Sequence, residues 1–448
     1  MSEEWEEWAK DDFWTNEEVL EAIEAGQQEH AMHSTTKQAG AVEEIKWLKR
    51  NFLEHRQDGG GNINDIEDLD ASTQKTPFQK HRGNKGFLSV TDMCSMEWCG
   101  LQFHYTLEGP GRKPETSAMK LGKRIHSELE LELHDLVEIQ ATTKEDTWGL
   151  RLLNCVTGLQ ELMTSGKTRE LPVFGFVRFP CRKAELDSFA TNCATRNRAG
   201  QYFLIYGVLD EITRKESRVK VSKMEPQKRL TDFFGNAQKV NGDIAAENAN
   251  CDWDFLLSDT KTKVSDRLAK HFSAQRSARM QLMVYKYLYD SLVTTSSQFP
   301  CKDFFSTLDL DPDLPLSTEV LNYAKFFIPT LAIDDEGPPL LTLRTLLNVV
   351  LSHFALFPTL ENKLCLSYVH QETLSSLGEI HFTYSSAQLA YQLNKALGYW
   401  SGEKMEPVMR GVDISEAGWK CWSCDYFEQC EWRRTCASEL AEKSQLRS

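Results

Sequence analysis

The stretch YFLIYGVLDEI, residues 202–212, is an apolar run rich in β-branched and aromatic residues, and it leads into Asp210. A second run of this kind, DFLLSDTKT at residues 254–262, carries Asp259 and Lys261. Both runs are typical of buried β-strands. Since residues i and i+2 of a strand share a face, Asp259 and Lys261 are predicted to point into one site. The fold class indicated is mixed α/β.

These side chains suit one chemistry. Carboxylates from two adjacent strands, Asp210 and Asp259, supply the hard oxygen ligands that Mg²⁺ or Mn²⁺ prefers, and the Lys261 ammonium would lie beside an attacked phosphate. The pattern therefore predicts phosphodiester hydrolysis. The Asp-x-Lys motif is a weak signal by itself, because strand edges often carry Asp and Lys for solubility.

Composition limits the alternatives. The chain has 448 residues, 41% of them hydrophobic, and a net charge of -15, so it can bury a large core, and length alone suggests two to four domains. No apolar run is long enough to span a bilayer, and we expect no membrane partner. The N-terminus, MSEEWEEWAKDDFW, is acidic where a transit peptide would be basic. We expect a nuclear protein, with the cytosol as a second compartment, and any nucleic-acid site must be a local basic patch.

Three regions are predicted along the chain. Residues 1–86 read as an acidic, partly disordered N-terminal extension, residues 87–435 as the folded domain, and residues 436–448 as a tail. Within the domain, RMQLMVYKYLYD at residues 279–290 has the periodicity of a helix.

Further motifs surround the two strands. His126 lies in LGKRIHSELE, a probable helical segment, and Gln281 and Tyr285 are four residues apart on one helical face. The sequence between Asp259 and Tyr285 concentrates positive charge that could follow a phosphate backbone. Its basic residues are Arg267, Lys270, Arg276 and Arg279.

The ordered set H…GxxD…DxK…QxxxY resembles the RecB-type branch of the PD-(D/E)xK nucleases, which have a restriction-endonuclease-like core. The resemblance makes Asp210 and Asp259 the metal-binding acids and Lys261 the catalytic lysine. His126 matches a motif histidine that is also a metal ligand in some members, and Gln281 and Tyr285 match a supporting and DNA-binding helix. Glu170, in TRELPVFG, occupies the place of a further acidic residue.

A cysteine cluster lies near the C-terminus. GWKCWSCDYFEQCEWRR contains Cys421, Cys424 and Cys430, three soft ligands close enough in sequence to share one metal centre. A fourth ligand must come from elsewhere, and by spacing alone zinc and an iron-sulfur cluster are both open. In RecB-type nucleases with an iron-sulfur staple, one cysteine precedes the nuclease motifs, and Cys94 and Cys99 are the candidates here.

The segments VTD…WCxLQ, ELPVFG, GVLDEI, YVHQET and WKCxxCxYxxxCEWR together resemble the exonuclease V family in its animal form. That resemblance selects Cys99 as the first ligand of a four-cysteine [4Fe-4S] cluster that closes the domain. It implies a hydrolase that degrades single-stranded DNA from an end, with a role in DNA repair and genome maintenance. It leaves the polarity open. Many relatives carry Glu where this chain has Asp259, and since both ligate Mg²⁺ we expect activity to survive.

Residues 213–252 form a long insertion in this family pattern. It contains QKRLTDFF, in which Gln227, Leu230, Phe233 and Phe234 resemble the peptide motif that binds the sliding clamp PCNA, the proliferating cell nuclear antigen. The apolar members would share one side of a 3₁₀ turn and fill a hydrophobic pocket. Alternatively, the two phenylalanines anchor the insertion on the nuclease core.

We expect a monomer, with single-strand-binding protein as a further candidate partner. Two other functions stay open. The chain could be a non-catalytic DNA-binding or clamp-binding scaffold, which the intact Asp210, Asp259 and Lys261 oppose, or a zinc-stapled nuclease with a different substrate. TSGKTRE lacks the first glycine of a P-loop, so no ATPase is predicted.

Overall fold

A computed structural model describes residues 75–109, 120–125, 141–189, 200–215, 253–266, 272–328, 341–422 and 424–435, and residues 117, 139 and 268. The predicted clamp motif at 227–234, His126 and the tail at 436–448 lie outside the described residues. Among the helices that are described, none combines the length and the apolar character that crossing a bilayer requires.

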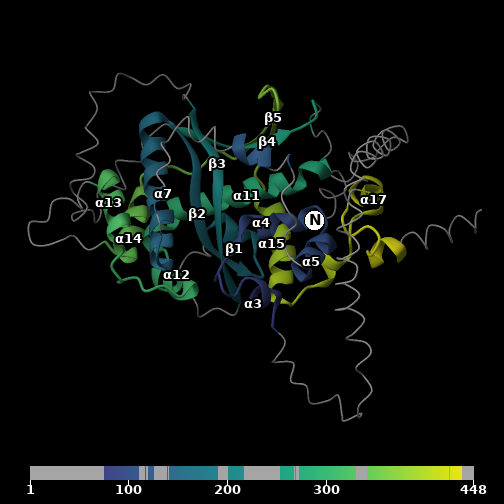
Figure 1. Cartoon of the computed structure of the whole chain (residues 1–448), viewed down its shortest axis with the longest axis horizontal. Helices are drawn as coiled ribbons and strands as arrows, with labels where there is room; N and C mark the ends of the chain where they lie inside the picture. The colour runs from purple at the N-terminus through teal and green to yellow at the C-terminus, as the bar shows by residue number, and fades with distance from the viewer. Residues whose placement is uncertain are drawn as a thin grey trace, which may run out of the picture.

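The described chain is built around one mixed sheet with helices packed against it (Figure 1). The strands are β1 (Leu88–Ser89), β2 (Lys167–Phe179), β3 (Gln201–Lys215), β4 (Asp254–Lys263), β5 (Lys363–His370) and β6 (Ser376–Thr383). β3 and β4 confirm the two strands predicted from their apolar runs. Length alone suggested several domains, whereas these strands, from residue 88 to residue 383, belong to one sheet.

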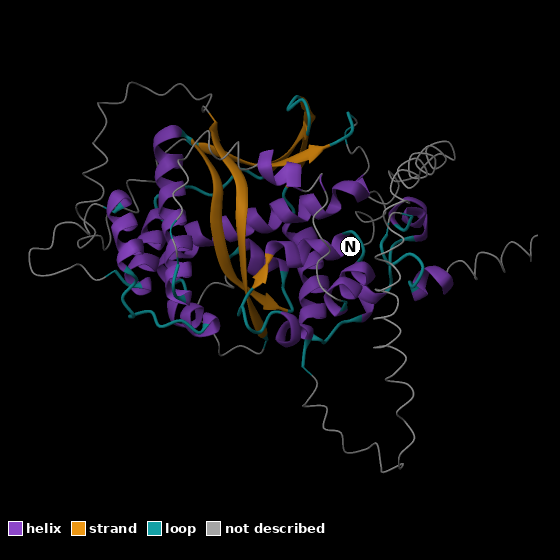
Figure 2. Ribbon diagram, viewed as in Figure 1, coloured by secondary structure: helices purple, strands orange, loops and turns teal. Residues whose placement is uncertain are grey.

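The sheet forks along β3. Strand β2 pairs antiparallel with β3 from Lys167 to Phe179, so it occupies one edge of β3. The other edge is divided, with β1 parallel to the first half of β3 and β4 antiparallel to its last five residues. β4 continues away from β3 to pair in parallel with β5, and β5 pairs antiparallel with β6. Figure 2 shows the two long strands β2 and β3 side by side, with β4 and β5 leading away from one end.

Helices pack against the sheet. Their bounds are α3 (Pro77–His81), α4 (Val90–Cys94), η3 (Ser95–Glu97), α5 (Gly100–Glu108), α7 (Lys144–Ser165), α8 (Lys183–Asp187), α11 (Phe272–Thr295), η6 (Ser296–Gln298), α12 (Cys301–Leu308), α13 (Thr318–Phe327), α14 (Leu343–Phe354), α15 (Ser386–Ser401), α16 (Glu406–Met409) and α17 (Ile414–Lys420). Helix α11 confirms the helix predicted at 279–290 and contacts β2, β3, β4 and β5. Helix α7 is capped by the Thr143 side chain, ends at Gly166 in the left-handed conformation, and packs on β2.

The two ends of the domain meet. Helix α15 packs against α3 and α4, and α16 packs against α5. Residues 75–86, which the sequence placed in the N-terminal extension, pack against the folded domain. Phe78 packs edge to face on Phe203 with 5.4 Å between ring centroids, and Arg82 binds Asp92 through Nη2 and Oδ1 at 2.6 Å.

Candidate active site and cysteine pocket

Asp210 and Asp259 lie at the fork of the sheet. The pairing of β3 with β4 stops at Glu211 and Ser258, and the two aspartates are the next residues of their strands. Both are buried, with exposed fractions of 6% and 3%. The backbone N–H of Thr260 donates to Asp210 Oδ2 at 2.6 Å, which orients the first carboxylate toward the strand that carries the second.

Lys261 shares this site, as the strand alternation predicts. Its Nζ lies 2.7 Å from Asp259 Oδ2 and donates to Gln281 Oε1 at 3.0 Å. Gln281 Nε2 in turn donates to the Tyr285 hydroxyl at 3.3 Å. Four residues predicted for the site are thus brought into one network between β4 and α11. Burial alone would lower the pKa of Lys261, but Asp259 and then Asp210 outweigh it and raise that pKa above 10.5.

Arg169 is a member of the site that the sequence did not reveal. Its guanidinium is buried and lies 3.1 Å from Asp210 Oδ1 through Nη2 and 3.1 Å from Glu211 Oε2 through Nη1. Each aspartate of the site therefore has a cationic partner, Arg169 for Asp210 and Lys261 for Asp259. The available signal was an arginine directly before Glu170, followed by the largely apolar stretch Leu171–Val177.

Glu170 interrupts the ladder between β2 and β3. The pairs on either side are Arg169 with Glu211 and Leu171 with Leu209, so Glu170 lies opposite Asp210. Its φ of 50° is in the left-handed region, which is strained for a residue with a side chain. Its charge contributes, after burial, to raising the pKa of Tyr285. Glu170 thus lies at the fork, as the family resemblance implied, and strain of this kind is common at functional sites.

His126 lies outside the described residues, and only the helical segment that leads to it can be placed. A Cβ added to Gly122 would lie 3.0 Å from Thr262 Oγ1, so that segment approaches the strand that carries Lys261. The prediction for His126 remains a prediction.

The predicted basic patch is partly engaged within the protein. Arg276 Nη2 lies 2.9 Å from Glu416 Oε1, so this arginine joins α11 to α17. Arg279 donates from Nε to Gln275 Oε1 at 3.0 Å and packs against the rings of Phe272 and Phe382. Arg267 and Lys270 lie outside the described residues. A phosphate-binding role for Arg276 and Arg279 stays a prediction.

The site fits a hard divalent cation. Asp210 and Asp259 lie on adjacent strands and offer the carboxylate oxygens that such an ion prefers, and each carboxylate is paired with a cationic side chain, Arg169 or Lys261. Two carboxylates, an ammonium and a supporting glutamine can bind a metal, activate water and stabilise charge on a phosphate.

Cys99, Cys421, Cys424 and Cys430 line one pocket together with aromatic side chains. The aromatic members are Tyr105, Tyr426, Phe427 and Trp432. The Gln102 N–H lies 3.4 Å from Cys99 Sγ and donates to it, as backbone amides do to thiolate ligands. Cys94 lies elsewhere, buried beside Lys261 and Asp259. The described cysteines are all free thiols.

The four sulfurs of the pocket do not form a tight group. In the described residues, three His, Cys, Asp or Glu ligand atoms come within 4.8 Å of one another only at Cys365, Glu379 and His381, so no three of the four sulfurs do. Tetrahedral zinc with Zn–S bonds of about 2.3 Å would hold its sulfurs about 3.8 Å apart. The sulfurs of the pocket are therefore spread more widely than the ligands of a bound zinc ion. Burial, with the neighbouring thiols, raises the pKa of Cys421 to about 12, so binding of a positive centre is needed to stabilise its thiolate.

The sequence is similar to proteins of one known family. A family model described as "Exonuclease V - a 5' deoxyribonuclease" matches residues 76–327 and 336–433. The chain is similar to zebrafish Exonuclease V, with 28% identity over 80% of this chain and 73% of the relative. It is also similar to "Exonuclease V, mitochondrial" of Eremothecium gossypii, with 22% identity over 78% of this chain and 76% of the relative, and to that of Candida glabrata, with 21% identity over 80% and 81%.

The names of these yeast relatives correct one prediction. They are called mitochondrial, so the expectation of a nuclear protein is wrong by this comparison. The acidic first residues gave no sufficient ground for setting the mitochondrion aside.

Proposed function

Because this chain belongs to the exonuclease V family, we propose that it is a metal-dependent exonuclease that degrades single-stranded DNA from its 5′ end. The observation that carries the proposal is the contiguous network of Asp259, Lys261, Gln281 and Tyr285 beside Asp210. The polarity rests on the description of the family. A PD-(D/E)xK core is supported by the two aspartates at a sheet fork and by the lysine on the face of the second.

The residues divide the chemistry between them. A Mg²⁺ or Mn²⁺ ion held by Asp210 and Asp259, with His126 as a further candidate ligand, would act as a Lewis acid on the scissile phosphate and lower the pKa of a bound water. Lys261 stays protonated, because its pKa is raised, and places a positive charge where negative charge develops on the phosphate. Gln281 fixes the ammonium from the side opposite Asp259 and so limits its rotation.

We further propose that Cys99, Cys421, Cys424 and Cys430 hold a [4Fe-4S] cluster. The apolar lining, the shared pocket and the wide spacing of the sulfurs support it over zinc. A cluster there would join α5 to the segment after α17, and so the two ends of the domain.

The test of the nuclease uses linear single strands and the matched duplex, each labelled at the 5′ or the 3′ end, together with a circular single strand that carries an internal label. Wild-type protein with Mg²⁺ should release label from the 5′ end of the linear strand and spare the circle and the duplex. Asp210→Asn should abolish the activity, because it removes a ligand charge without changing shape. Protein that is folded yet inactive would instead favour the scaffold function, which the intact charged network opposes.

The test of the cluster compares Cys424→Ser with Cys301→Ser. Cys301 lies at the start of α12 and does not line the pocket, so it controls for loss of a thiol. Only Cys424→Ser should lose iron, sulfide and brown colour. Equal iron in both variants would refute the assignment, and zinc in place of iron in wild-type protein would favour a zinc staple.

The partner and the pathway remain proposals of their own. A role in DNA repair requires single-stranded ends, and single-strand-binding protein is a candidate for presenting them. Clamp binding through Gln227, Leu230, Phe233 and Phe234 would require that a peptide of residues 226–235 bind PCNA in calorimetry. PCNA acts on nuclear DNA, so clamp binding would matter only if the protein reaches the nucleus. Because the yeast relatives are called mitochondrial, the mitochondrion is the compartment to test first.

A further inference from the structure

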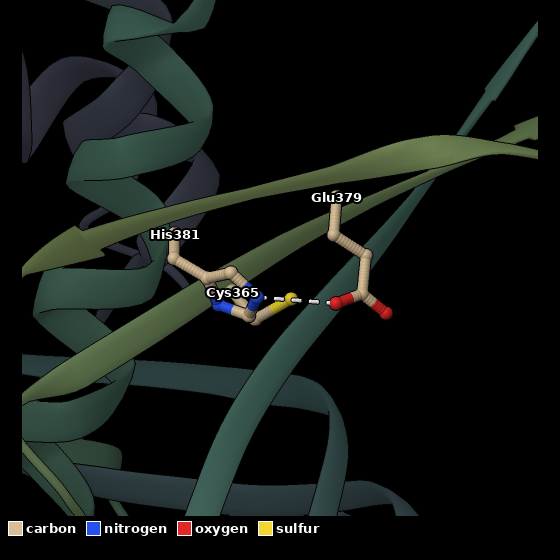
Figure 3. Close-up of side chains that lie close together, drawn as sticks. All are labelled: Cys365, Glu379 and His381. Atoms are coloured by element: carbon tan, nitrogen blue, oxygen red, sulfur yellow. Dashed lines mark ion pairs between the residues drawn. The ribbon is translucent and has the colours of Figure 1, made fainter.

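A second group of metal-ligating side chains lies on the β5–β6 hairpin. Cys365 and His381 are direct cross-strand partners, and Glu379 is two residues before His381 on the same face. The Cys365 sulfur, a Glu379 carboxylate oxygen and a His381 ring nitrogen all lie within 4.8 Å of one another. Figure 3 shows the three side chains pointing toward one another from the two strands.

The contacts within the group bring together the atoms that would bind a metal. His381 Nε2 lies 3.2 Å from Glu379 Oε2, and the thiol of Cys365 is hydrogen-bonded to Glu379. Cys365 is buried, which fixes its position, whereas the side chains of Glu379 and His381 are 54% and 36% exposed and can adjust. Zinc ligands at about 2.0–2.3 Å are about 3.3–3.8 Å apart. The His381 and Glu379 atoms, 3.2 Å apart, are already close to this spacing, and the Cys365 sulfur lies within 4.8 Å of both.

The ligand types select the ion. A thiolate, an imidazole and a carboxylate together suit the borderline-soft Zn²⁺, whereas Mg²⁺ prefers oxygen ligands alone. We propose that Cys365, Glu379 and His381 form a Zn²⁺ site with a fourth position open to water.

This site is distinct from the nuclease site although the two share strands. Cys365 pairs with Ser258, the residue before Asp259, and side chains alternate along a strand. Cys365 therefore points to the face of the sheet opposite Asp259 and Lys261. Glu211, which pairs with Ser258 on the next strand, adds negative charge along the same row. Zinc there would tie β6, the last strand of the sheet in the described residues, to its neighbour.

The competing interpretation is a reactive thiol. A redox-sensitive cysteine needs a lowered pKa, but burial, followed by the Glu379 and Glu211 carboxylates, raises the pKa of Cys365 to about 12. The surroundings of Cys365 thus disfavour a reactive free thiolate.

The experiment measures Zn²⁺ bound to the full-length chain after dialysis at a fixed free Zn²⁺ concentration in excess Mg²⁺. Metal content is read by mass spectrometry in wild type, Glu379→Gln, His381→Gln, Cys365→Ser and the control Cys301→Ser. Wild type and control should hold one more zinc per chain than the three ligand variants. Loss of a direct ligand should weaken zinc binding by more than the roughly 10- to 100-fold that loss of an outer contact costs.

Two outcomes would overturn the proposal. Equal zinc content in wild type and in His381→Gln and Glu379→Gln would do so, and these exposed positions are chosen because their variants should fold even if Cys365→Ser does not. Zinc that is lost in Cys424→Ser but retained in His381→Gln would belong to the four-cysteine pocket, and the hairpin would hold none.

Discussion

Gln281 is the residue on which the geometry of the nuclease site makes its sharpest prediction. Its side chain joins Lys261, 3.0 Å away, to the Tyr285 hydroxyl, 3.3 Å away, and it binds no substrate in the mechanism proposed. Gln281→Leu keeps the volume and removes both hydrogen bonds. Lys261 then keeps only its ion pair with Asp259, and its ammonium is held from one side.

The size of the effect follows from the kinds of bond that are lost. A hydrogen bond to a charged group contributes about 1.5–3 kcal/mol, and each 1.36 kcal/mol in the barrier is a factor of ten in rate. If that energy positions Lys261 in the transition state, kcat should fall by about 10- to 150-fold. Tyr285→Phe removes only the more distant neutral bond, about 0.5–1.5 kcal/mol, so its loss should be about 2- to 13-fold. Lys261→Met removes the charge itself and should be the most severe.

The assay is single-turnover cleavage of end-labelled single-stranded DNA at saturating Mg²⁺, with DNA affinity measured separately by anisotropy. A positioning role predicts a lower rate with nearly unchanged affinity. Gln160→Leu is the matched control, because Gln160 donates one hydrogen bond to the Phe327 carbonyl on α13, away from the fork. A rate for Gln281→Leu within about twofold of wild type, in folded protein, would refute the reasoning. So would a Tyr285→Phe variant that is slower than Gln281→Leu.

Three further predictions concern stability. Gly207→Ala should lower the free energy of unfolding by about 1–3 kcal/mol, seen as a lower melting temperature, because a Cβ there would lie 2.5 Å from Val90 Cγ2 and 2.6 Å from Tyr285 Cε1. Arg82→Met should lower the free energy of unfolding by about 3 kcal/mol in denaturant titration, since it leaves buried Asp92 without its guanidinium partner. An unchanged unfolding midpoint would mean that residues 75–86 do not stabilise the domain. Burial alone would raise the pKa of Asp92, but hydrogen bonds from Arg82 and Ser89 outweigh it and lower that pKa below 3.8. Asp92 therefore stabilises the fold above pH 3.8, and the stability advantage of wild type over Asp92→Asn should shrink as the pH falls below that value, whereas a constant difference would contradict the assigned shift.

Local sequence patterns predicted the parts of the fold that local physics determines. The apolar runs before Asp210 and Asp259 became β3 and β4, because such residues pack well on a pleated, partly buried surface. The spacing of Gln281 and Tyr285 placed both on one face of α11 because a helix turns every 3.6 residues. The contact of Asp259 with Lys261 follows from alternation within one strand.

Features that depend on register between distant strands could not be predicted in this way. Arg169 reaches Asp210 only because β2 pairs with β3 in one register, which is set by packing along the whole strand. The meeting of Cys365 with His381 depends on the hairpin register, which shifts by one residue beyond Tyr368. Arg276 appeared to be a free cation for DNA because nothing near it in sequence indicates Glu416, 140 residues away.

The ion pair between Arg276 and Glu416 offers a route by which the cysteine pocket could affect the nuclease site without electron transfer. Lys420, directly before Cys421, is buried, lies 2.6 Å from Glu416, and packs over the ring of Trp98, directly before Cys99. Glu416 also binds Arg276, which is five residues before Gln281 on α11.

A contiguous set of contacts therefore runs from the two ends of the pocket to the helix that positions Lys261. If the pocket opened, Lys420 and Glu416 would lose the packing that holds them, and the ion pair that anchors the start of α11 would weaken. Coupling by position requires only that a few contacts have a bound and a released arrangement. A centre bound by the four cysteines would therefore support activity by keeping α11 in place.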